Sequence, residues 1–455
     1  MQGGTWIARP KSRFLRTAPG NPTSFRVTRP TMSDSFDLAE VYRDLHAHPE
    51  LSLQETRTAG IVARHLGSFG YEVTSEVGGT GVVGVLRNGT GPVALLRADM
   101  DALPVAEQTG LPYASTARAT DHAGHDVPVM HACGHDVHVT CLLGAAQMLA
   151  ADTSSWRGTL LLVFQPAEEL GRGAQAMVDD GLYDRFGTPD VVLGQHVAPL
   201  PAGVIGLRAG PSFAGADTLE VTMHGRGAHG SRPEVSVDPV VMAAATVMRL
   251  QTVVSREVAG ADTAVLTVGA LRAGTKENII PDDAELLMSI RTFDPDVRET
   301  VLSAIERVVN GEAAASGAPK PPEIARTMSF PAVVNDADGV ARTRLAFEDE
   351  FGVQSVVDPG PVTGSEDVGV LATAAAAPCV FWLLGGAEPK AFAGATDIAA
   401  LQRVVQGLPS NHSPLFAPVI EPTLPTGVTA LVRAARTWLG TVARAATFNA
   451  RDLGS

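Results

Sequence analysis

The sequence contains few cysteines, no long apolar run and no excess of positive charge. Three of its 455 residues are cysteine, and so odd and sparse a set forms no disulfide framework and indicates a reducing compartment. No stretch reaches the roughly 18 consecutive apolar residues that a membrane helix needs. The formal net charge of -14 argues against a nucleic-acid binder, which requires a basic face. These absences predict a cytoplasmic protein without a membrane or nucleic-acid partner.

The first 32 residues differ from the rest of the chain. They contain six basic residues and no acidic one, and they lack the apolar core of a secretion signal. We expect this segment to be a disordered tail, or to precede a true translation start at Met32. The remaining chain is too long for one compact core, so we expect more than one domain.

Two patterns of apolar residues divide the chain. Residues 35–214 and 332–450 alternate strand-like and helix-like segments, which is typical of an α/β/α domain with a mostly parallel sheet. Residues 215–331 instead follow the order β-α-β-β-α-β, with elements expected at 218–224, 239–254, 264–271, 284–292, 296–315 and 323–329. We therefore predict an α/β catalytic domain into which a ferredoxin-like domain is inserted.

Two shorter segments give local predictions. Ser52-x-x-Glu55 has the pattern of a capping box, which predicts the start of a helix that ends near Gly70. Residues 385–407 are rich in Gly, Ala and Pro and show little periodicity, so we expect a surface loop there.

Acidic or imidazole side chains follow three predicted strands. Asp99 and Asp101 come after the strand at 93–97. Glu168 and Glu169 follow the strand at 159–164, and His196 follows the one at 191–193. Ligands of open α/β sheets bind beyond the carboxyl ends of the strands. We therefore expect these five side chains at one edge of one sheet.

A thiol and an imidazole lie in a tight Ala-Cys-Gly-His turn before a predicted helix. Cys133 and His135 can meet one ion there, and such ligands suit Zn, Mn, Co or Ni better than Mg or Ca. The alternative is an inert buried cysteine beside a histidine that starts a helix. The nearby His131, Asp136 and His138 favour the metal site.

The adjacent acids Glu168 and Glu169 diverge in an extended loop, so one can bind metal while the other faces the substrate. A water that attacks a carbonyl needs a base to take its proton and pass it to the leaving nitrogen. A solvated acidic loop is the alternative. Asp101 is a candidate to orient a histidine that binds metal.

The inserted domain offers three further candidates. His229 lies in a Gly-rich loop and could donate a hydrogen bond to a developing oxyanion. Asn278 and Arg291 could hold a substrate carboxylate, which a guanidinium contacts through two parallel hydrogen bonds. Turn and surface roles remain open for all three.

Together these motifs resemble the M20 family of metallopeptidases and amidohydrolases. Within it, the chain resembles the aminoacylase-like branch that includes hippurate hydrolases and indole-acetyl-amino-acid hydrolases. The motifs that carry the resemblance are Leu45-His-Ala-His-Pro-Glu-Leu-Ser52, Arg97-Ala-Asp-Met-Asp-Ala-Leu-Pro104, Met130-His-Ala-Cys-Gly-His-Asp-Val-His138, Phe164-Gln-Pro-Ala-Glu-Glu169, Gly194-Gln-His-Val197, Gly227-Ala-His-Gly230, Asn278-Ile-Ile-Pro281, Gly364-Ser-Glu-Asp367 and Asn411-His-Ser-Pro414.

The resemblance implies a site for two divalent cations, with Mn or Zn favoured over Co or Ni. Glu168 would be the general base. The inserted domain would act as a lid and dimerisation module, through which His229 reaches the active site of a partner. Asn278 and Arg291 would lie near the substrate carboxylate. The implied metal ligands are Cys133, His135, Glu169, His196 and His412.

The implied reaction is hydrolysis of the amide bond of an N-acyl amino acid to a carboxylic acid and a free amino acid. Water attacks the acyl carbonyl, Glu168 moves the proton, and His229 helps to stabilise the oxyanion. A dipeptidase or an aminobenzoyl-glutamate-type hydrolase would use the same site. A binding protein without catalysis and a structural zinc protein are alternatives of other classes, and the intact Glu168 argues against the first.

Two segments look longer than in the family that the chain resembles. Residues 117–129 contain two histidines and two aspartates, and they could narrow the mouth, add a peripheral metal contact or form a plain surface loop. Residues 385–409 precede His412, and their conformation does not follow from the resemblance.

Overall fold

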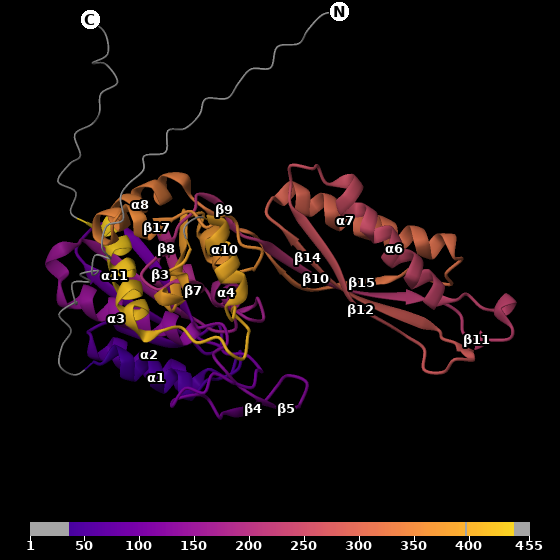
Figure 1. Cartoon of the computed structure of the whole chain (residues 1–455), viewed down its shortest axis with the longest axis horizontal. Helices are drawn as coiled ribbons and strands as arrows, with labels where there is room; N and C mark the ends of the chain where they lie inside the picture. The colour runs from indigo at the N-terminus through magenta and orange to yellow at the C-terminus, as the bar shows by residue number, and fades with distance from the viewer. Residues whose placement is uncertain (1–35, 396–397, 441–455) are drawn as a thin grey trace, which may run out of the picture.

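The computed structural model describes residues 36–395 and 398–440 of the chain. A broad domain lies at one end and an elongated domain projects from it (Figure 1). The expectations for residues 1–32 fall outside the described residues. None of the helices in the described ranges is long and apolar enough to cross a membrane.

The broad domain is built on an eight-stranded sheet with the order β1-β2-β6-β3-β7-β18-β8-β17. Its four middle strands, β6, β3, β7 and β18, run parallel to one another, as predicted. The strands are β1 (Glu72–Val77), β2 (Gly81–Asn88), β3 (Val93–Asp99), β6 (Gly158–Gln165), β7 (Val191–Pro201), β8 (Ile205–Gly206), β17 (Val356–Val357) and β18 (Cys379–Ala387).

Each face of this sheet carries its own hydrophobic core, because successive residues of a strand point to opposite faces. Leu96 and Leu160 belong to one core, and Leu95 and Leu161 belong to the other. The first core is covered by α1 (Leu38–Ala47), α2 (Thr56–Ser68), α3 (His135–Ala151), α8 (Ala337–Phe351) and α11 (Ile420–Leu439), and the second by α4 (Gly173–Asp179), α5 (Leu182–Phe186) and α9 (Val368–Ala375).

The elongated domain, called the lid below, is a four-stranded antiparallel sheet with two helices. Its strand order, β12-β14-β10-β15, and its element order, β-α-β-β-α-β, are those of a ferredoxin-like unit, as the sequence predicts. Its core lies between sheet and helices. The elements are β10 (Gly215–His224), α6 (Pro239–Glu257), β12 (Ala264–Ala273), β14 (Asp283–Thr292), α7 (Pro295–Ala315) and β15 (Glu323–Phe330).

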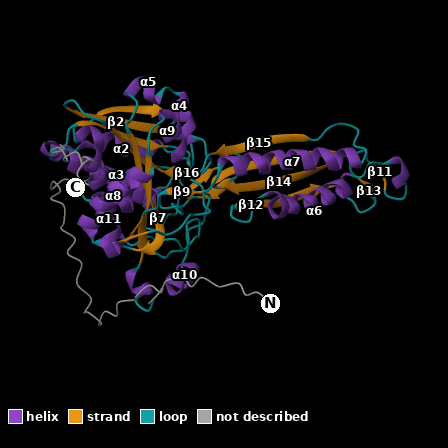
Figure 2. Cartoon of the chain, turned by 90° about the horizontal axis from the view of Figure 1, so that it is seen from above, coloured by secondary structure: helices purple, strands orange, loops and turns teal. Residues whose placement is uncertain are grey.

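Two short strands connect the lid to the broad domain. β9 (Gly210–Phe213) enters the lid and pairs with β16 (Val333–Asn335), which returns from it. The opposite end of the lid carries the small sheet of β11 (Ala228–His229) and β13 (Ile279–Ile280), far from the broad domain (Figure 2). The lid therefore has a hinge end and a distal tip.

The predicted capping box is wrong. α2 begins at Thr56, and Glu55 stands at its N-cap without a side-chain capping bond. Ser52 instead donates a hydrogen bond to Asp101, while the Glu55 carboxylate accepts bonds from Thr80 and from the backbone N–H of Ala167. Neither side chain caps the helix, because both are already bonded to groups elsewhere in the fold.

The predicted loop at 385–407 is also corrected. β18 continues to Ala387, a short 3₁₀ helix spans Pro389–Phe392, and α10 occupies Ile398–Gly407. The Gly, Ala and Pro content of the whole segment predicted a loop, and α10 is too short to give a clear helical pattern within it. Residues 117–129 include an exposed hairpin of β4 (Arg118–Thr120) and β5 (Asp126–Pro128).

Candidate metal centre

The five side chains predicted at the sheet edge lie together. Asp99 is the last residue of β3, and Asp101 follows two positions later. Glu168 and Glu169 come directly after β6. His196 was predicted to follow its strand, and this prediction is wrong. It lies within β7, which continues to Pro201 because it stays paired with β18. The imidazole still reaches the cluster.

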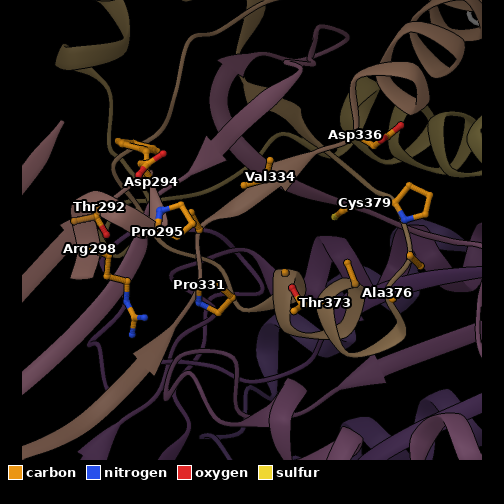
Figure 3. A pocket seen from close by; sticks show the side chains of 16 residues that line it. Thr292, Asp294, Pro295, Arg298, Pro331, Val334, Asp336, Thr373, Ala376 and Cys379 are labelled. Atoms are coloured by element: carbon orange, nitrogen blue, oxygen red, sulfur yellow. The ribbon is translucent and has the colours of Figure 1, made fainter. Parts of the chain in front are cut away.

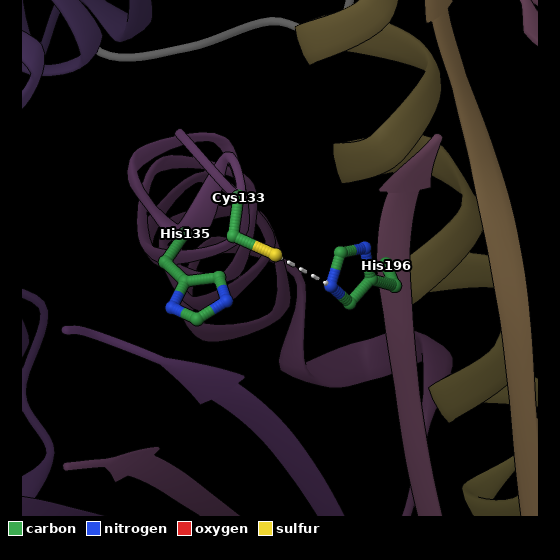
Figure 4. Close-up of side chains that lie close together, drawn as sticks. All are labelled: Cys133, His135 and His196. Carbon is green, nitrogen blue, oxygen red and sulfur yellow. Dashed lines mark hydrogen bonds between the residues drawn. The ribbon is translucent and has the colours of Figure 1, made fainter. Parts of the chain in front are cut away.

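Cys133, His135 and His196 form one group whose ligand atoms all lie within 4.8 Å of one another (Figure 4). Sγ of Cys133 is 3.5 Å from Nε2 of His196. Nδ1 of His196 donates a hydrogen bond to the carbonyl oxygen of Val197 at 2.8 Å. This bond fixes the tautomer, so Nε2 carries a lone pair that faces the thiol.

A second group shares the same thiol. Cys133, Glu169 and His412 have ligand atoms within 4.8 Å of one another, and Nε2 of His412 lies 3.4 Å from Oε1 of Glu169. The backbone N–H of His412 donates to the carbonyl oxygen of Ala132 at 2.8 Å, which ties the two segments together. Because Sγ belongs to both groups, it lies where one thiolate can contact two ions.

Asp101 lies against His135 and the acidic loop and holds them in place. Oδ1 of Asp101 is 3.3 Å from Nδ1 of His135. Its carboxylate also accepts hydrogen bonds from the Ser52 hydroxyl at 2.6 Å and from the backbone N–H groups of Glu168 and Glu169 at 3.1 and 3.0 Å. Burial raises the pKa of Asp101, but these contacts outweigh burial and lower it below its ordinary value. Asp101 is thus an anion that orients its neighbours.

His138 supports the site but has no free nitrogen for an ion. Its Nδ1 donates to Asp99 at 2.5 Å, and its Nε2 accepts from the backbone N–H of Val197 at 2.8 Å. Burial lowers the pKa of His138 to about 4, so the ring is neutral at physiological pH.

Two buried groups indicate that the cluster fits a cation. Neither ring nitrogen of His135 nor Oε1 of Glu169 makes a hydrogen bond of good geometry within the described ranges, and such buried polar atoms are costly. Burial alone would lower the pKa of His135, yet the surrounding carboxylates, Asp99 foremost, raise it to about 10. The site thus has an excess of negative charge. Thiolate, imidazole and carboxylate donors together suit Zn or Mn.

Glu168 lies beside the cluster and is buried. Its carboxylate is 3.9 Å from Nε2 of His135. Burial and then the charges of Glu366 and Glu169 raise its pKa well above the ordinary value. A carboxylate in such surroundings is a stronger base than one in water.

A buried arginine network, which the sequence did not predict, lies under the cluster. Arg97 on β3 contacts Asp99 at 2.7 Å, Glu366 at 2.8 Å and Asp367 at 3.0 Å, and it donates to Gln165 at 2.9 Å. The signal was present, since an arginine inside an apolar strand needs partners. Two of its partners, Glu366 and Asp367, lie 269 and 270 residues away in the chain, so only the fold identifies them.

The cluster opens into a pocket of about 620 Å³ between the two domains. Arg291, at the hinge end of the lid, lines this pocket and hydrogen-bonds to the hydroxyl of Ser365. Among the residues that the structure describes, no carboxylate pairs with Arg291, although it is about half buried. His229 belongs to β11 and Asn278 directly precedes β13, and both strands lie at the distal tip of the lid (Figure 2). Neither residue lines the pocket of its own chain.

A second pocket, of about 640 Å³, lies behind the hinge between α7 and α9 (Figure 3). Its charged groups are already engaged. Asp294 and Asp336 cap α7 and α8, and Arg298 makes two 2.7 Å hydrogen bonds to Asp217. With its charges satisfied internally, this pocket offers no comparable chemistry.

Comparison with known proteins agrees with the geometry. Residues 95–408 match the profile of peptidase family M20/M25/M40. The chain is 39% identical over 336 residues to a hippurate hydrolase of Campylobacter jejuni, which covers 73% of this chain and 84% of that one. It is 37% identical over 342 residues to an N-acetyl-L-cysteine deacetylase of Bacillus subtilis, with 72% and 76% covered.

A solved structure has the same fold. It is a Bacillus subtilis protein described as a dinuclear metal-binding peptidase of family M20, with a TM-score of 0.67 and 30% identity, covering 88% of this chain and 97% of that one. The predicted resemblance is therefore confirmed, and the chain belongs to peptidase family M20/M25/M40.

Proposed function

We propose that this protein hydrolyses the amide bond of N-acyl amino acids, releasing a carboxylic acid and a free amino acid. The observation that carries this proposal is the buried carboxylate of Glu168 beside two candidate ligand groups that share one thiol. They lie in a pocket that also contains Arg291, which has no acidic partner among the described residues. The names of the similar hippurate hydrolase and N-acetyl-L-cysteine deacetylase support it.

The proposed metal ligands are divided between the two groups. His135 and His196 would hold one divalent cation, Glu169 and His412 would hold the other, and Cys133 would contact both. Mn or Zn fits these donors best, with Co or Ni also compatible. When bound, such cations polarise the substrate carbonyl and lower the pKa of a nearby water.

Glu168 would act as the proton carrier. Its carboxylate takes a proton from the attacking water as the new C–O bond forms, and then gives that proton to the nitrogen as the C–N bond breaks. Its burial excludes competing solvent, and the bond from its backbone N–H to Asp101 fixes its position.

Arg291 would bind the carboxylate of the substrate. It is a half-buried cation without an acidic partner in the described part of the chain, so an anionic ligand would satisfy it. Its hydrogen bond to Ser365 orients the guanidinium toward the pocket that it lines.

His229 and Asn278 would serve the active site of a second copy. The distal tip holds both residues close together, because Gly230 donates a backbone hydrogen bond to the carbonyl oxygen of Asn278. We propose a homodimer formed through the lid, whose outer surface exposes Met248 on α6 and Leu271 on β12. In such a dimer His229 would donate a hydrogen bond to the oxyanion and Asn278 would contact the substrate.

The free cysteines fit a cytoplasmic location.

The function is tested by free-amine release from N-acyl amino acids and dipeptides, with added Mn or Zn and with a chelator. Metal-dependent release from the acyl amino acids is expected. No release from any of them, in protein shown to hold its metals, contradicts the proposal.

A further inference from the structure

We infer that the pocket selects N-acyl amino acids whose acyl group is apolar and at least as large as benzoyl, and that α10 forms part of the wall that binds this group. The inference rests on the proposed hydrolysis of N-acyl amino acids and specifies the substrate class. It concerns the part of the pocket that neither the metal cluster nor Arg291 occupies.

The positions of the cluster and of Arg291 set the direction of the substrate. The scissile carbonyl must lie at the cluster, next to Glu168, and the substrate carboxylate at Arg291 on the lid side of the pocket. The carboxylate and the acyl group lie on opposite sides of the amide bond. The acyl group therefore extends from the cluster in a different direction from the carboxylate, and most of the lining that it can meet belongs to the broad domain.

That wall is apolar. Leu200 at the end of β7, Leu383 on β18 and Pro359 converge around Gly206, where a Cβ atom would lie 3.1–3.2 Å from each of them. This close approach means that the three side chains, all of which line the pocket, lie around one point. No larger residue than glycine fits at that point without displacing them.

The apolar surface continues on the hinge side and on α10. Phe213 and Val362 line the pocket and are held side by side by a backbone bridge. Val405 of α10 completes the lining, and α10 lies in the segment whose conformation the resemblance could not supply. Leu401 on the same helix is exposed and does not line the pocket.

The chemistry of this wall excludes polar acyl groups and disfavours small ones. Leu200, Phe213, Pro359, Val362, Leu383 and Val405 offer no side-chain hydrogen bond, so a polar acyl group would lose its water without replacement. The pocket volume of about 620 Å³ is within the range of roughly 300–1,000 Å³ that holds drug-sized ligands. An acetyl group would leave most of the wall uncovered, whereas a phenyl ring or an alkyl chain would bury it.

The first test compares kcat/KM for N-acetyl-, N-benzoyl- and N-decanoylglycine in the metal-loaded enzyme. Benzoyl and decanoyl substrates should exceed acetyl by at least about tenfold, because burying their extra apolar surface stabilises the bound state. Equal or faster hydrolysis of the acetyl substrate overturns the inference and leaves the proposed function standing. No hydrolysis of any of the three contradicts the proposed function itself.

The second test changes the wall at α10. Val405→Trp fills the space and Val405→Asp adds a charge. Each should lower the benzoyl-to-acetyl ratio of kcat/KM at least about fivefold. Leu401→Trp and Leu401→Asp, on the same helix but outside the pocket, should leave the ratio unchanged.

A further arm distinguishes the acyl group from the amino-acid side chain. Substrates with a constant benzoyl group and different amino acids should keep their ranking in the Val405 variants. If the Val405 variants fold like the wild type by circular dichroism and leave the acyl ratio unchanged, or change the amino-acid ranking instead, α10 does not bind the acyl group.

Discussion

The sheet edge of the broad domain and the lid contribute to the site in different ways. The sheet edge brings residues from five distant motifs into one cluster. Three of these motifs lie on or after neighbouring strands, the fourth lies at the start of α3, and the fifth is joined to the fourth by the backbone bond from His412 to Ala132. The lid instead separates its candidates: Arg291 lies at the hinge end in the pocket, while His229 and Asn278 lie at the distal tip. The cluster at the sheet edge gathers its residues from one chain, whereas the lid presents one end to its own pocket and, in the proposed homodimer, would present the other to the partner.

Loss of the proton carrier should have the largest effect on the sheet-edge side of this comparison. Glu168→Gln removes the base but keeps the size of the side chain, and kcat should fall about 10³-fold. Metal content measured by mass spectrometry should stay at the wild-type level, because Glu168 belongs to neither group that shares Cys133. Glu40→Gln, at an exposed position of α1 in the broad domain, is the matched control. A variant with near-normal kcat would rule out Glu168 as the base.

The distal tip should give the next largest effect. His229→Ala should lower kcat about 10²-fold, which is the usual cost of losing an oxyanion donor. Mixing this variant with Glu168→Gln tests whether the residue acts across a dimer. A mixed dimer would contain one intact site, so the mixture should regain about a quarter of wild-type activity. Failure to regain activity in subunits shown to exchange would place His229 outside the partner's site.

The hinge end of the lid should affect binding more than chemistry. Arg291→Gln should raise KM about 10- to 100-fold with a smaller change in kcat, because a charged contact with the substrate carboxylate is lost. Arg291→Lys keeps the charge but not the two parallel donors, so its KM should lie between those of the wild type and the Gln variant. A loss confined to kcat would argue against carboxylate binding.

The smallest expected effect is on the free energy of unfolding and comes from His46 on α1. His46 contacts Asp136 at 2.6 Å and Glu107 at 3.1 Å, and these bonds overcome burial and raise the pKa of His46 to about 10. The stabilisation from the charge of His46 is fully present below pH ~6.5, which is the pKa of histidine in the unfolded chain. It is lost as pH rises toward 10, the pKa in the folded protein.

Wild type should therefore lose about 1–3 kcal/mol of stability relative to His46→Gln between pH 6 and 9.5. Urea unfolding of both proteins in chelator measures this difference without a contribution from metal binding. Parallel pH dependence of the two proteins would mean that His46 carries no such charge.

The sequence predicted the parts of the fold and site that depend on local pattern. Alternating apolar segments identified both domains, and acids after β3 and β6 placed Asp99, Asp101, Glu168 and Glu169 at one edge. This worked because strand direction alone determines where those residues go.

The remaining features depend on tertiary contacts that no local pattern encodes. Ser52 and Glu55 fit a capping box, yet both side chains bond to groups at the site instead. Glu366 and Asp367, two of the partners of Arg97, lie far along the chain. His229 lies away from its own pocket because the lid is long and carries β11 at its far end. The Gly-rich sequence around His229 gives no information about that distance.

The alternation of β3 between two cores has an evolutionary consequence. Leu95 and Leu96 face different cores, and Arg97 shares the face of Leu95, toward α9 and its acidic neighbours. Substitutions in this strand can be accommodated one at a time. A single inserted or deleted residue would move every later side chain of the strand to the opposite face of the sheet. Residues of each core would then point into the other core, and Arg97 would point away from Asp367. Descendants of this gene should thus vary in β3 by replacement and never by a change of length.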